Sequence, residues 1–181
     1  MKINPTEFQD LYIIEPRVFK DDRGFFYESY STVKFQDKGI NYSFVQDNHA
    51  KSNEAGVLRG LHYQKPPYAQ TKLVRVIKGS VLDVVVDLRQ KSPTFKKWFG
   101  IELSEENFLT LLVPPGFAHG YLVLEPNTEF LYKVDNFYNV ESEGGIIWND
   151  PELSIDWKIE KPILSEKDNK LPRLKESLNI F

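Results

Sequence analysis

The chain has three histidines and no cysteine, so acid–base or nucleophilic chemistry must come from histidine, carboxylate, lysine or tyrosine side chains. The absence of cysteine also excludes disulfides and thiolate metal sites. The histidines are His49, His62 and His119, and each lies beside a turn or the end of an apolar run. A single histidine more often has a structural, hydrogen-bonded role than a catalytic one. The residues around two of them favour chemistry.

The segment GVLRGLHYQ contains His62, and the segment PPGFAHG contains His119. Together with Lys72 and Gly79 they resemble the two motifs of the cupin superfamily, whose metal-binding members use two histidines one residue apart, a glutamate and a third histidine. Here Gln64 stands at the second histidine position and Lys72 at the glutamate position. An ammonium group at the centre would repel a divalent cation. The pattern therefore predicts a metal-free pocket with a lysine as its positive charge.

A histidine and a lysine in one pocket suit the removal of a proton next to a carbonyl group. A base takes the C–H proton, a cation stabilises the enolate oxygen, and an acid on the opposite face returns a proton with inversion. His62 suits the base because an imidazole exchanges protons near neutral pH, and Lys72 suits the cation. Tyr132 is a candidate acid, and Tyr138 would share its face in an unbroken strand. The polar residues between them would interrupt that register, and both tyrosines also fit as ordinary strand residues.

Short strands must position these side chains. The run LVRVIKGSVLDVVVDL, at residues 73–88, is interrupted at Gly79 and predicts a hairpin. Further apolar runs lie at 98–103, 108–113, 120–124 and 129–134. This spacing predicts a mainly β fold, a cupin-type antiparallel jelly roll or β-sandwich with short peripheral helices. We expect a short helix at 31–38 and a helical C-terminal extension at about 163–181.

Composition and charge limit the class of protein. The 181 residues fit a single domain, 1–181, and 41% apolar residues supply a sizeable core. The 23 lysines and arginines against 26 aspartates and glutamates give a net charge of −3, which argues against nucleic acid as a partner. The sequence has no apolar run of about 18 residues and no signal-peptide pattern. We therefore expect a cytoplasmic protein without a membrane partner.

Nine segments in order carry a closer resemblance. They are GFFYESY, FVQDNHAKS, GVLRGLHYQ, KLVRVIKGSVLDVVVDLR, SPTF, PPGFAHGYLVL, EFLYKV, WNDPELSIDW and LSEKD. Together they resemble the dTDP-4-dehydrorhamnose 3,5-epimerase family of dTDP-rhamnose biosynthesis. The resemblance implies a jelly-roll isomerase that needs no metal and no cofactor and acts on dTDP-4-dehydro-6-deoxy-D-glucose. It also implies a homodimer with sites shared across the interface.

The resemblance assigns roles to the catalytic candidates. His62 matches the family's proton acceptor, Asp168 the carboxylate paired with it, Tyr132 the proton donor, and Lys72 the residue near the sugar keto oxygen. Asp168 has a local alternative, because the segment SEKD also fits a capping box that opens a C-terminal helix. Asp83 is a further acidic residue that would pair with Lys72 across the expected hairpin.

The resemblance also implies a nucleotide diphosphate, whose charges need guanidinium or ammonium groups. Arg23 and Arg59 match the family's positions for this role. The other positions that match substrate contacts are Phe26, Glu28, Gln46, Asn48, His119, Tyr138, Glu143 and Lys167. In the family, the segment 23–28 reaches the pocket of the neighbouring subunit, and the ring at the position of Tyr138 stacks against the substrate.

Both arginines have a local complication. Arg23 follows two aspartates, so it also fits a solvated charge cluster in a turn. Arg59 and His62 are three residues apart and would face opposite sides of a regular strand. A bulge at Gly60 would bring them to the same side.

Several functions remain compatible with the sequence. The first is inversion at C3 and C5 to give dTDP-4-dehydro-L-rhamnose. Similar enzymes invert only C3 or only C5, or are 3,4-ketoisomerases, and act on dTDP-, GDP- or CDP-linked keto-sugars. Ala50 replaces a serine found in many members and leaves sugar and nucleotide preference open. A non-catalytic sugar-nucleotide-binding jelly roll explains the aromatic residues but not the joint presence of His62, Lys72, Tyr132 and Asp168. The two replaced metal ligands disfavour a metal-dependent oxygenase.

Overall fold

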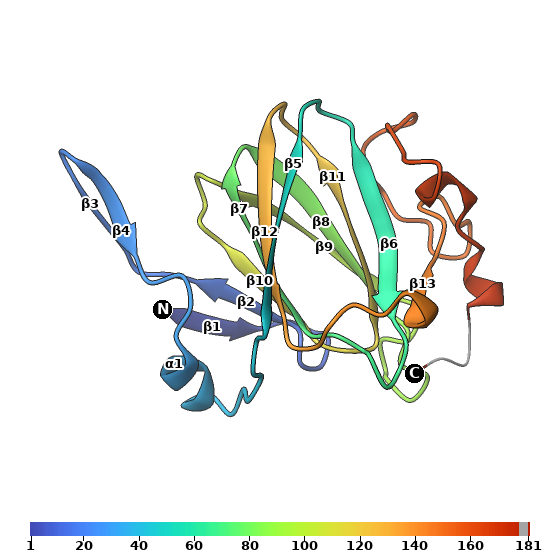
Figure 1. Cartoon of the computed structure of the whole chain (residues 1–181), viewed down its shortest axis with the longest axis horizontal. Helices are drawn as coiled ribbons and strands as arrows, with labels where there is room; N and C mark the ends of the chain where they lie inside the picture. Colours follow the sequence, from blue (N-terminus) through green and yellow to red (C-terminus); the bar gives the residue numbers. More distant parts are fainter. Residues whose placement is uncertain (178–180) are drawn as a thin grey trace.

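Two antiparallel sheets packed face to face form the body of the molecule, and the computed structural model describes residues 1–177 and 181 (Figure 1). In spatial order, the six-stranded sheet consists of β1 (Lys2–Pro5), β2 (Tyr12–Glu15), β10 (Thr110–Val113), β7 (Lys72–Lys78), β12 (Thr128–Val134) and β5 (Gln46–Ser52). The five-stranded sheet consists of β13 (Glu143–Gly145), β6 (Leu58–Gln64), β11 (Phe117–Val123), β8 (Ser80–Asp87) and β9 (Trp98–Ser104). The predicted mainly β, antiparallel jelly roll is confirmed.

The main core lies between the sheets, where alternate residues of each strand point inward. On β8, Val81 and Val85 belong to this inner core, whereas Val84 and Val86 belong to a second core on the outer face of the sheet. The C-terminal part of the chain covers that outer face, with Trp157 fully packed into it. Because β8 is buried on both faces, its sequence reads as a continuous apolar run rather than an alternation.

The predicted hairpin at residues 73–88 is wrong. Gly79 forms the expected turn with φ +72°, and a Cβ atom there would lie 2.3 Å from the Thr128 hydroxyl oxygen. However, β7 pairs with β10 and β12, while β8 pairs with β11 and β9. The turn therefore carries the chain from one sheet to the other. Local sequence predicts the turn, but the partner of each strand is set by distant segments.

The helices are short. Helix α1 (Thr32–Gln36) forms within the predicted range, and the Ser31 hydroxyl caps its N-terminus. The C-terminal extension has only two 3₁₀ turns, Asp168–Lys170 and Leu174–Glu176, in place of the expected helix, and residues 178–180 lie outside the described part. Pro172 explains the interruption, because it lacks an N–H group and favours an extended residue before it. Among the described residues, no helix is long and apolar enough to cross a membrane.

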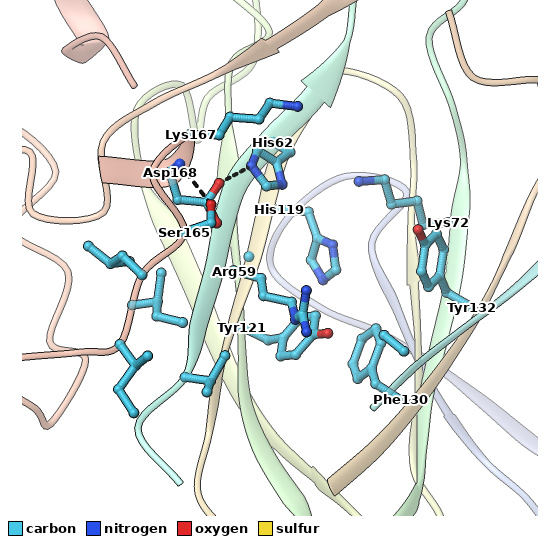
Figure 2. A pocket seen from close by; sticks show the side chains of 16 residues that line it. Arg59, His62, Lys72, His119, Tyr121, Phe130, Tyr132, Ser165, Lys167 and Asp168 are labelled. Atoms are coloured by element: carbon cyan, nitrogen blue, oxygen red, sulfur yellow. Dashed lines mark hydrogen bonds and ion pairs between the residues drawn. The ribbon is translucent and has the colours of Figure 1, made fainter. Parts of the chain in front are cut away.

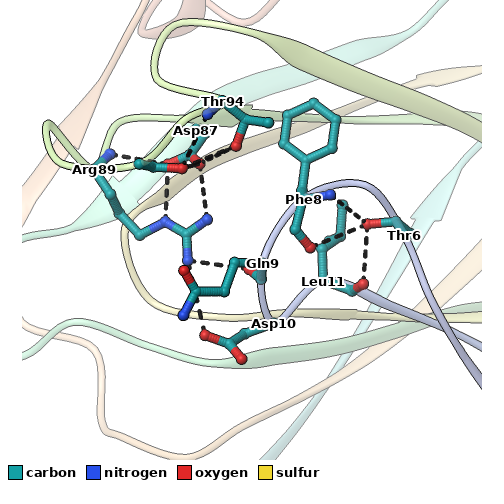
Figure 3. Close-up of polar contacts among 9 residues, drawn as sticks. Thr6, Phe8, Gln9, Asp10, Leu11, Asp87, Arg89 and Thr94 are labelled. Atoms are coloured by element: carbon teal, nitrogen blue, oxygen red, sulfur yellow. Dashed lines mark hydrogen bonds and ion pairs between the residues drawn. The ribbon is translucent and has the colours of Figure 1, made fainter.

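A buried carboxylate ties the N-terminal loop to the sandwich (Figure 3). Asp87, at the end of β8, is fully buried and accepts hydrogen bonds from the Arg89 guanidinium at 2.9 and 2.8 Å, from Ser92 at 2.6 Å and from Thr94 at 2.7 Å. Arg89 also donates to the Gln9 carbonyl oxygen at 3.1 Å. Burial alone would raise the pKa of Asp87, but these hydrogen bonds outweigh it and hold the pKa below its usual value.

A two-stranded hairpin of β3 (Val18–Asp21) and β4 (Gly24–Tyr27) projects from the sandwich (Figure 1). Large apolar side chains on this hairpin are exposed, and Phe26 is the most exposed of them at 70%. Exposed aromatic side chains on a projecting element are typical of a segment that contacts another molecule.

Candidate active site

A cavity of about 470 Å³ opens between the two sheets (Figure 2). Strands β5, β7 and β12 form one wall, β6 and β11 form the opposite wall, and the segment 163–168 lies along β6. The lining residues are Ala50, Val57, Leu58, Arg59, His62, Lys72, His119, Gly120, Tyr121, Phe130, Tyr132, Ile163, Leu164, Ser165, Lys167 and Asp168. The cavity thus brings together the four predicted catalytic residues with Arg59, His119 and Lys167.

His62 and Asp168 form a hydrogen-bonded pair, with 2.6 Å between His62 Nε2 and Asp168 Oδ1. Burial alone would raise the pKa of Asp168, but its hydrogen bonds and the charge of His62 hold the pKa below its usual value. The ionised carboxylate only accepts hydrogen bonds, so the proton of a neutral His62 sits on Nε2. Nδ1 of His62 is then free to take a proton.

Only half of the capping-box alternative for Asp168 is present. Its backbone N–H donates to the Ser165 hydroxyl oxygen at 3.0 Å, but its carboxylate pairs with His62, and the residue opens a short 3₁₀ turn instead of the expected helix. The Ser165 cap fixes the position from which the carboxylate reaches the imidazole.

Strand β6 contains the predicted bulge. His62 is opposite His119 and Arg59 is opposite Tyr121, so a step of three residues on β6 faces a step of two on β11. Gly60 makes the bulge possible with φ +117°, and a Cβ atom there would lie 2.6 Å from Gly120 Cα. As a result, Arg59 and His62 both line the cavity.

Lys72 stands at the start of β7 and supplies the cation on the six-stranded wall. Loss of hydration lowers the pKa of Lys72 to about 8, although the negative charges of Asp83 and Glu143 act in the opposite direction. The ammonium form is still about ten times more abundant than the amine at pH 7.

The expected pairing of Asp83 with Lys72 across a hairpin is wrong, because β7 and β8 lie in different sheets. Instead, both carboxylate oxygens of the fully buried Asp83 lie 3.0 and 2.9 Å from His119 Nε2. Asp83 acts on Lys72 through its charge across the cavity.

Tyr132 lies on the wall opposite His62 (Figure 2). It belongs to β12 in the six-stranded sheet, whereas His62 belongs to β6 in the five-stranded sheet. Burial raises the pKa of Tyr132, with the charge of Arg59 acting against it, so the phenol is protonated near neutral pH. A base and an acid therefore face each other across the space where a ligand would lie.

The comparison with known proteins agrees with this geometry. The family model described as dTDP-4-dehydrorhamnose 3,5-epimerase matches residues 5–176. The chain belongs to this epimerase family. A Shigella flexneri dTDP-4-dehydrorhamnose 3,5-epimerase is 53% identical over 169 residues, which are 93% of this chain and 93% of that protein.

Two solved structures of the epimerase family illustrate the similarity. The dTDP-4-dehydrorhamnose 3,5-epimerase of Bacillus anthracis, with TDP and PPi bound, is 53% identical, has a TM-score of 0.94, and the match covers 96% of this chain and 99% of that one. A dTDP-6-deoxy-D-glucose-3,5-epimerase from Legionella pneumophila, in complex with dTDP-4-keto-L-rhamnose, is 46% identical with a TM-score of 0.91, and the match covers 96% of this chain and 93% of that one.

Tyr138 and Glu143 lie beside the cavity, next to the lining residue Lys167. Tyr138 follows the end of β12, so it does not continue the strand register of Tyr132, and its hydroxyl donates to Glu143 at 2.8 Å. Lys167, at the rim, forms an ion pair with the same Glu143. These three residues form one hydrogen-bonded group next to the His62 pair.

Gln46 and Asn48 lie on β5, at the open edge of the six-stranded sheet. The Gln46 side-chain amide donates to the Asn48 side-chain oxygen at 2.8 Å. Asn48 is directly opposite Tyr132 on β12, and opposed residues of antiparallel strands share a face. Both side chains can therefore reach a ligand that extends past Tyr132.

The structure does not bring Arg23, Phe26 and Glu28 to this cavity. Arg23 and Phe26 lie on the projecting β3–β4 hairpin, and Glu28 follows it (Figure 1). The Arg23 side chain is 90% exposed and pairs with Asp21 at 2.6 Å, as in the solvated charge cluster considered above. Glu28 forms an ion pair with Lys34. None of the three residues belongs to the lining of the cavity that contains His62.

Two aromatic residues of the cavity lining, Tyr121 and Phe130, were not predicted from the sequence. Tyr121 lies two residues after His119 on β11, and Phe130 lies two residues before Tyr132 on β12. Alternate residues of a strand share a face, so this spacing was the signal that could have found them.

Gln64, at the position of a cupin metal ligand, has a structural role. It is buried, and its side-chain oxygen accepts a hydrogen bond from the Asn139 backbone N–H at 3.0 Å. Within the described residues, no group of three histidine, aspartate or glutamate side chains is arranged to hold a metal ion.

Proposed function

We propose that the chain is a dTDP-4-dehydrorhamnose 3,5-epimerase that converts dTDP-4-dehydro-6-deoxy-D-glucose into dTDP-4-dehydro-L-rhamnose. The observation that carries the proposal is the placement of His62 and Tyr132 on opposite walls of one cavity, with Lys72 between the same two sheets (Figure 2). Inversion at carbon requires removal of a proton from one face and its return to the other. The family match and the ligand of the Legionella pneumophila relative agree with this chemistry.

The roles follow from the contacts. Nδ1 of His62 takes the proton from C5, and Asp168 stabilises the resulting imidazolium through the 2.6 Å hydrogen bond. The Lys72 ammonium stabilises the enolate oxygen that forms from the C4 carbonyl. Tyr132 donates its phenolic proton to the opposite face of C5. Solvent then restores the two proton carriers, and the same steps at C3 complete the reaction.

Exchange with solvent tests this mechanism directly. In deuterated buffer, the protein should introduce deuterium at both C3 and C5 of the keto-sugar nucleotide, as followed by proton NMR. His62→Ala should abolish exchange while dTDP still binds. Incorporation at one carbon only would identify a C3-only or C5-only epimerase, and saturable binding without exchange would identify a non-catalytic sugar-nucleotide-binding protein.

We assign the substrate-binding role to the residues around and beside the cavity. The Arg59 guanidinium is the group in the cavity lining best suited to a diphosphate, because it can donate several hydrogen bonds to phosphate oxygens. The remaining contacts are assigned to His119, Gln46, Asn48, Tyr138, Glu143 and Lys167. A panel of dTDP-, GDP- and CDP-linked 4-keto sugars, followed by the same NMR assay, reports which nucleotide this set of residues selects.

We also propose that the protein is a homodimer in which the β3–β4 hairpin reaches the cavity of the partner. Its exposed aromatic side chains support this proposal, as does the position of Arg23, Phe26 and Glu28 outside the lining of the cavity in their own chain. A mixture of Arg23→Ala and His62→Ala subunits tests it. A hybrid dimer has one cavity with both an intact His62 and an intact Arg23 from its partner, so mixing should restore exchange. No restoration in dimers shown to be hybrid would contradict sharing.

A further inference from the structure

Tyr121 lines the cavity but has no part in the mechanism above. The residue is only 6% exposed, and its ring stacks on Phe130 with 4.1 Å between ring centroids and an interplanar angle of 15°. The His119 ring lies 6.5 Å away on the same strand. These contacts fix the plane of the Tyr121 ring and therefore the direction of its hydroxyl group.

In the view of Figure 2 the Tyr121 and Arg59 side chains lie over the same part of the cavity, and the charge of Arg59 acts on the Tyr121 hydroxyl. Tyr121 is directly opposite Arg59 on β6 and opposite Asp83 on β8, so all three side chains share the inner face of the sheet. Within the described part of the chain, the Tyr121 hydroxyl forms no hydrogen bond, and its oxygen atom is not fully buried. The hydroxyl is therefore open to the cavity and available to a ligand.

The surroundings keep this hydroxyl a hydrogen-bond donor. Burial raises the pKa of Tyr121 to about 12, although the charge of Arg59 acts in the opposite direction. Among the described residues, the Arg59 guanidinium has only two long hydrogen bonds, at 3.4 Å to the Lys51 carbonyl oxygen and 3.5 Å to the Ser52 hydroxyl. Both groups therefore offer N–H or O–H donors to the same part of the cavity.

We propose that Tyr121 is a further substrate-binding residue that donates its phenolic hydrogen bond to a phosphate oxygen held by Arg59. The inference rests on the proposed function, because it requires a diphosphate at Arg59. An anionic oxygen strengthens a hydrogen bond, and a neutral phenol adds a donor without a second positive charge. A diphosphate held by both groups keeps the sugar at a fixed distance from His62 and Lys72.

Tyr121→Phe tests the proposal, because it keeps the ring stacked on Phe130 and removes only the hydroxyl group. Calorimetric titration should show a Kd for dTDP, and for inorganic pyrophosphate, that is raised ~10-fold to 100-fold, as expected for a lost hydrogen bond to a charged group. In the exchange assay, KM should rise more than kcat falls. Tyr63→Phe is the matched control, since Tyr63 is equally buried but lies in the outer core, and its titrations should match the wild type.

An unchanged Kd for both dTDP and pyrophosphate overturns the proposal. A loss confined to the sugar-bearing nucleotide also overturns it, because the phenol would then contact the sugar. If Tyr121→Phe does not fold, a crystal structure of the wild-type protein with dTDP decides: a phosphate oxygen within hydrogen-bond distance of the Tyr121 hydroxyl supports the proposal, and a separated hydroxyl refutes it. Failure of the wild type to exchange deuterium while dTDP binds normally would count against the proposed function alone.

Discussion

Replacing Asp168 with asparagine removes one negative charge from the catalytic pair. The side chain of Asp168 is 6% exposed, and its oxygen lies 2.6 Å from His62 Nε2. An asparagine side-chain oxygen can still accept that hydrogen bond, so the imidazole keeps its orientation. The loss is therefore the attraction between the carboxylate and the imidazolium that forms when His62 takes a proton.

The magnitude of this loss follows from the geometry. The charges of a hydrogen-bonded imidazolium and carboxylate lie about 4 Å apart, and at an effective dielectric constant of about 20 they attract by about 4 kcal/mol. This attraction is absent when His62 is neutral, so it lowers the barrier and not the energy of the bound substrate. A barrier raised by about 4 kcal/mol corresponds to a rate roughly 10³-fold lower.

The assay is the rate of deuterium incorporation at C3 and C5 at saturating substrate. Asp168→Asn should slow both rates roughly 10³-fold while the Kd for dTDP stays close to the wild-type value. Asp150→Asn is the control, because Asp150 is also buried but binds the Glu152 and Leu174 backbone N–H groups outside the cavity. Asp150→Asn should lower the stability of the protein without slowing deuterium incorporation by the folded protein. An Asp168→Asn rate within tenfold of the wild type would refute the proposed role of the carboxylate.

Three other changes test separate parts of the structure. Since Lys72 has a pKa of about 8, the rate of exchange should fall as pH rises through that value. Lys72→Arg should remove this decrease from the pH–rate profile, because an arginine stays charged. A decrease that persists in the variant would assign it to another group. Asp87→Asn removes the buried carboxylate that pairs with Arg89, so urea unfolding should show a free energy of unfolding that is lower by about 3–5 kcal/mol. In the wild type, the contribution of Asp87 to stability is present above pH 3.8 and is lost as pH falls through its lowered pKa, and the variant should lack this pH dependence. Gly60→Ala forces a Cβ atom to within 2.6 Å of the backbone of β11, so exchange should fall by about 10²-fold as Arg59 and His62 lose their alignment. The control for this change is Gly39→Ala, which also places an alanine at positive φ, +76°, but has no neighbour within 4 Å of the added Cβ atom. Wild-type exchange in Gly60→Ala would contradict the role of the bulge.

The strands were predictable because their apolar runs and turn residues are local features of the sequence. The pairing of those strands was not predictable in the same way. Residues 73–88 read as a hairpin because two apolar runs flank Gly79, but each run is buried on faces that distant strands supply. Burial of β8 on both faces removes the alternation that would have shown its inner side. The C-terminal segment lacks a regular helix because it follows the outer face of the sheet as an irregular cover.

The residues of the candidate site also divide into those that could be predicted from local sequence and those that could not. His62, Lys72, His119 and Tyr132 were identified because each lies in a short motif with a recognisable chemical pattern. Tyr121 was missed because its two-residue spacing from His119 predicts a shared face of the strand but does not show whether that face lines a cavity or a packed core. Arg23 and Phe26 lie on the projecting β3–β4 hairpin and Glu28 follows it, which explains why none of them lines the cavity of its own chain.

The two histidine–aspartate pairs lie side by side on the same sheet, since His62 on β6 is directly opposite His119 on β11. Each histidine uses Nε2 to bind its own carboxylate, so hydrogen bonding alone does not distinguish the base from its neighbour. Exposure does. The His62 side chain is 30% exposed, whereas that of His119 is 7% exposed and its partner Asp83 is fully buried. A base that removes a carbon-bound proton must release it to solvent before the next turnover. His62 can do so at the rim of the cavity, whereas the enclosed His119 is suited to holding the sugar in place.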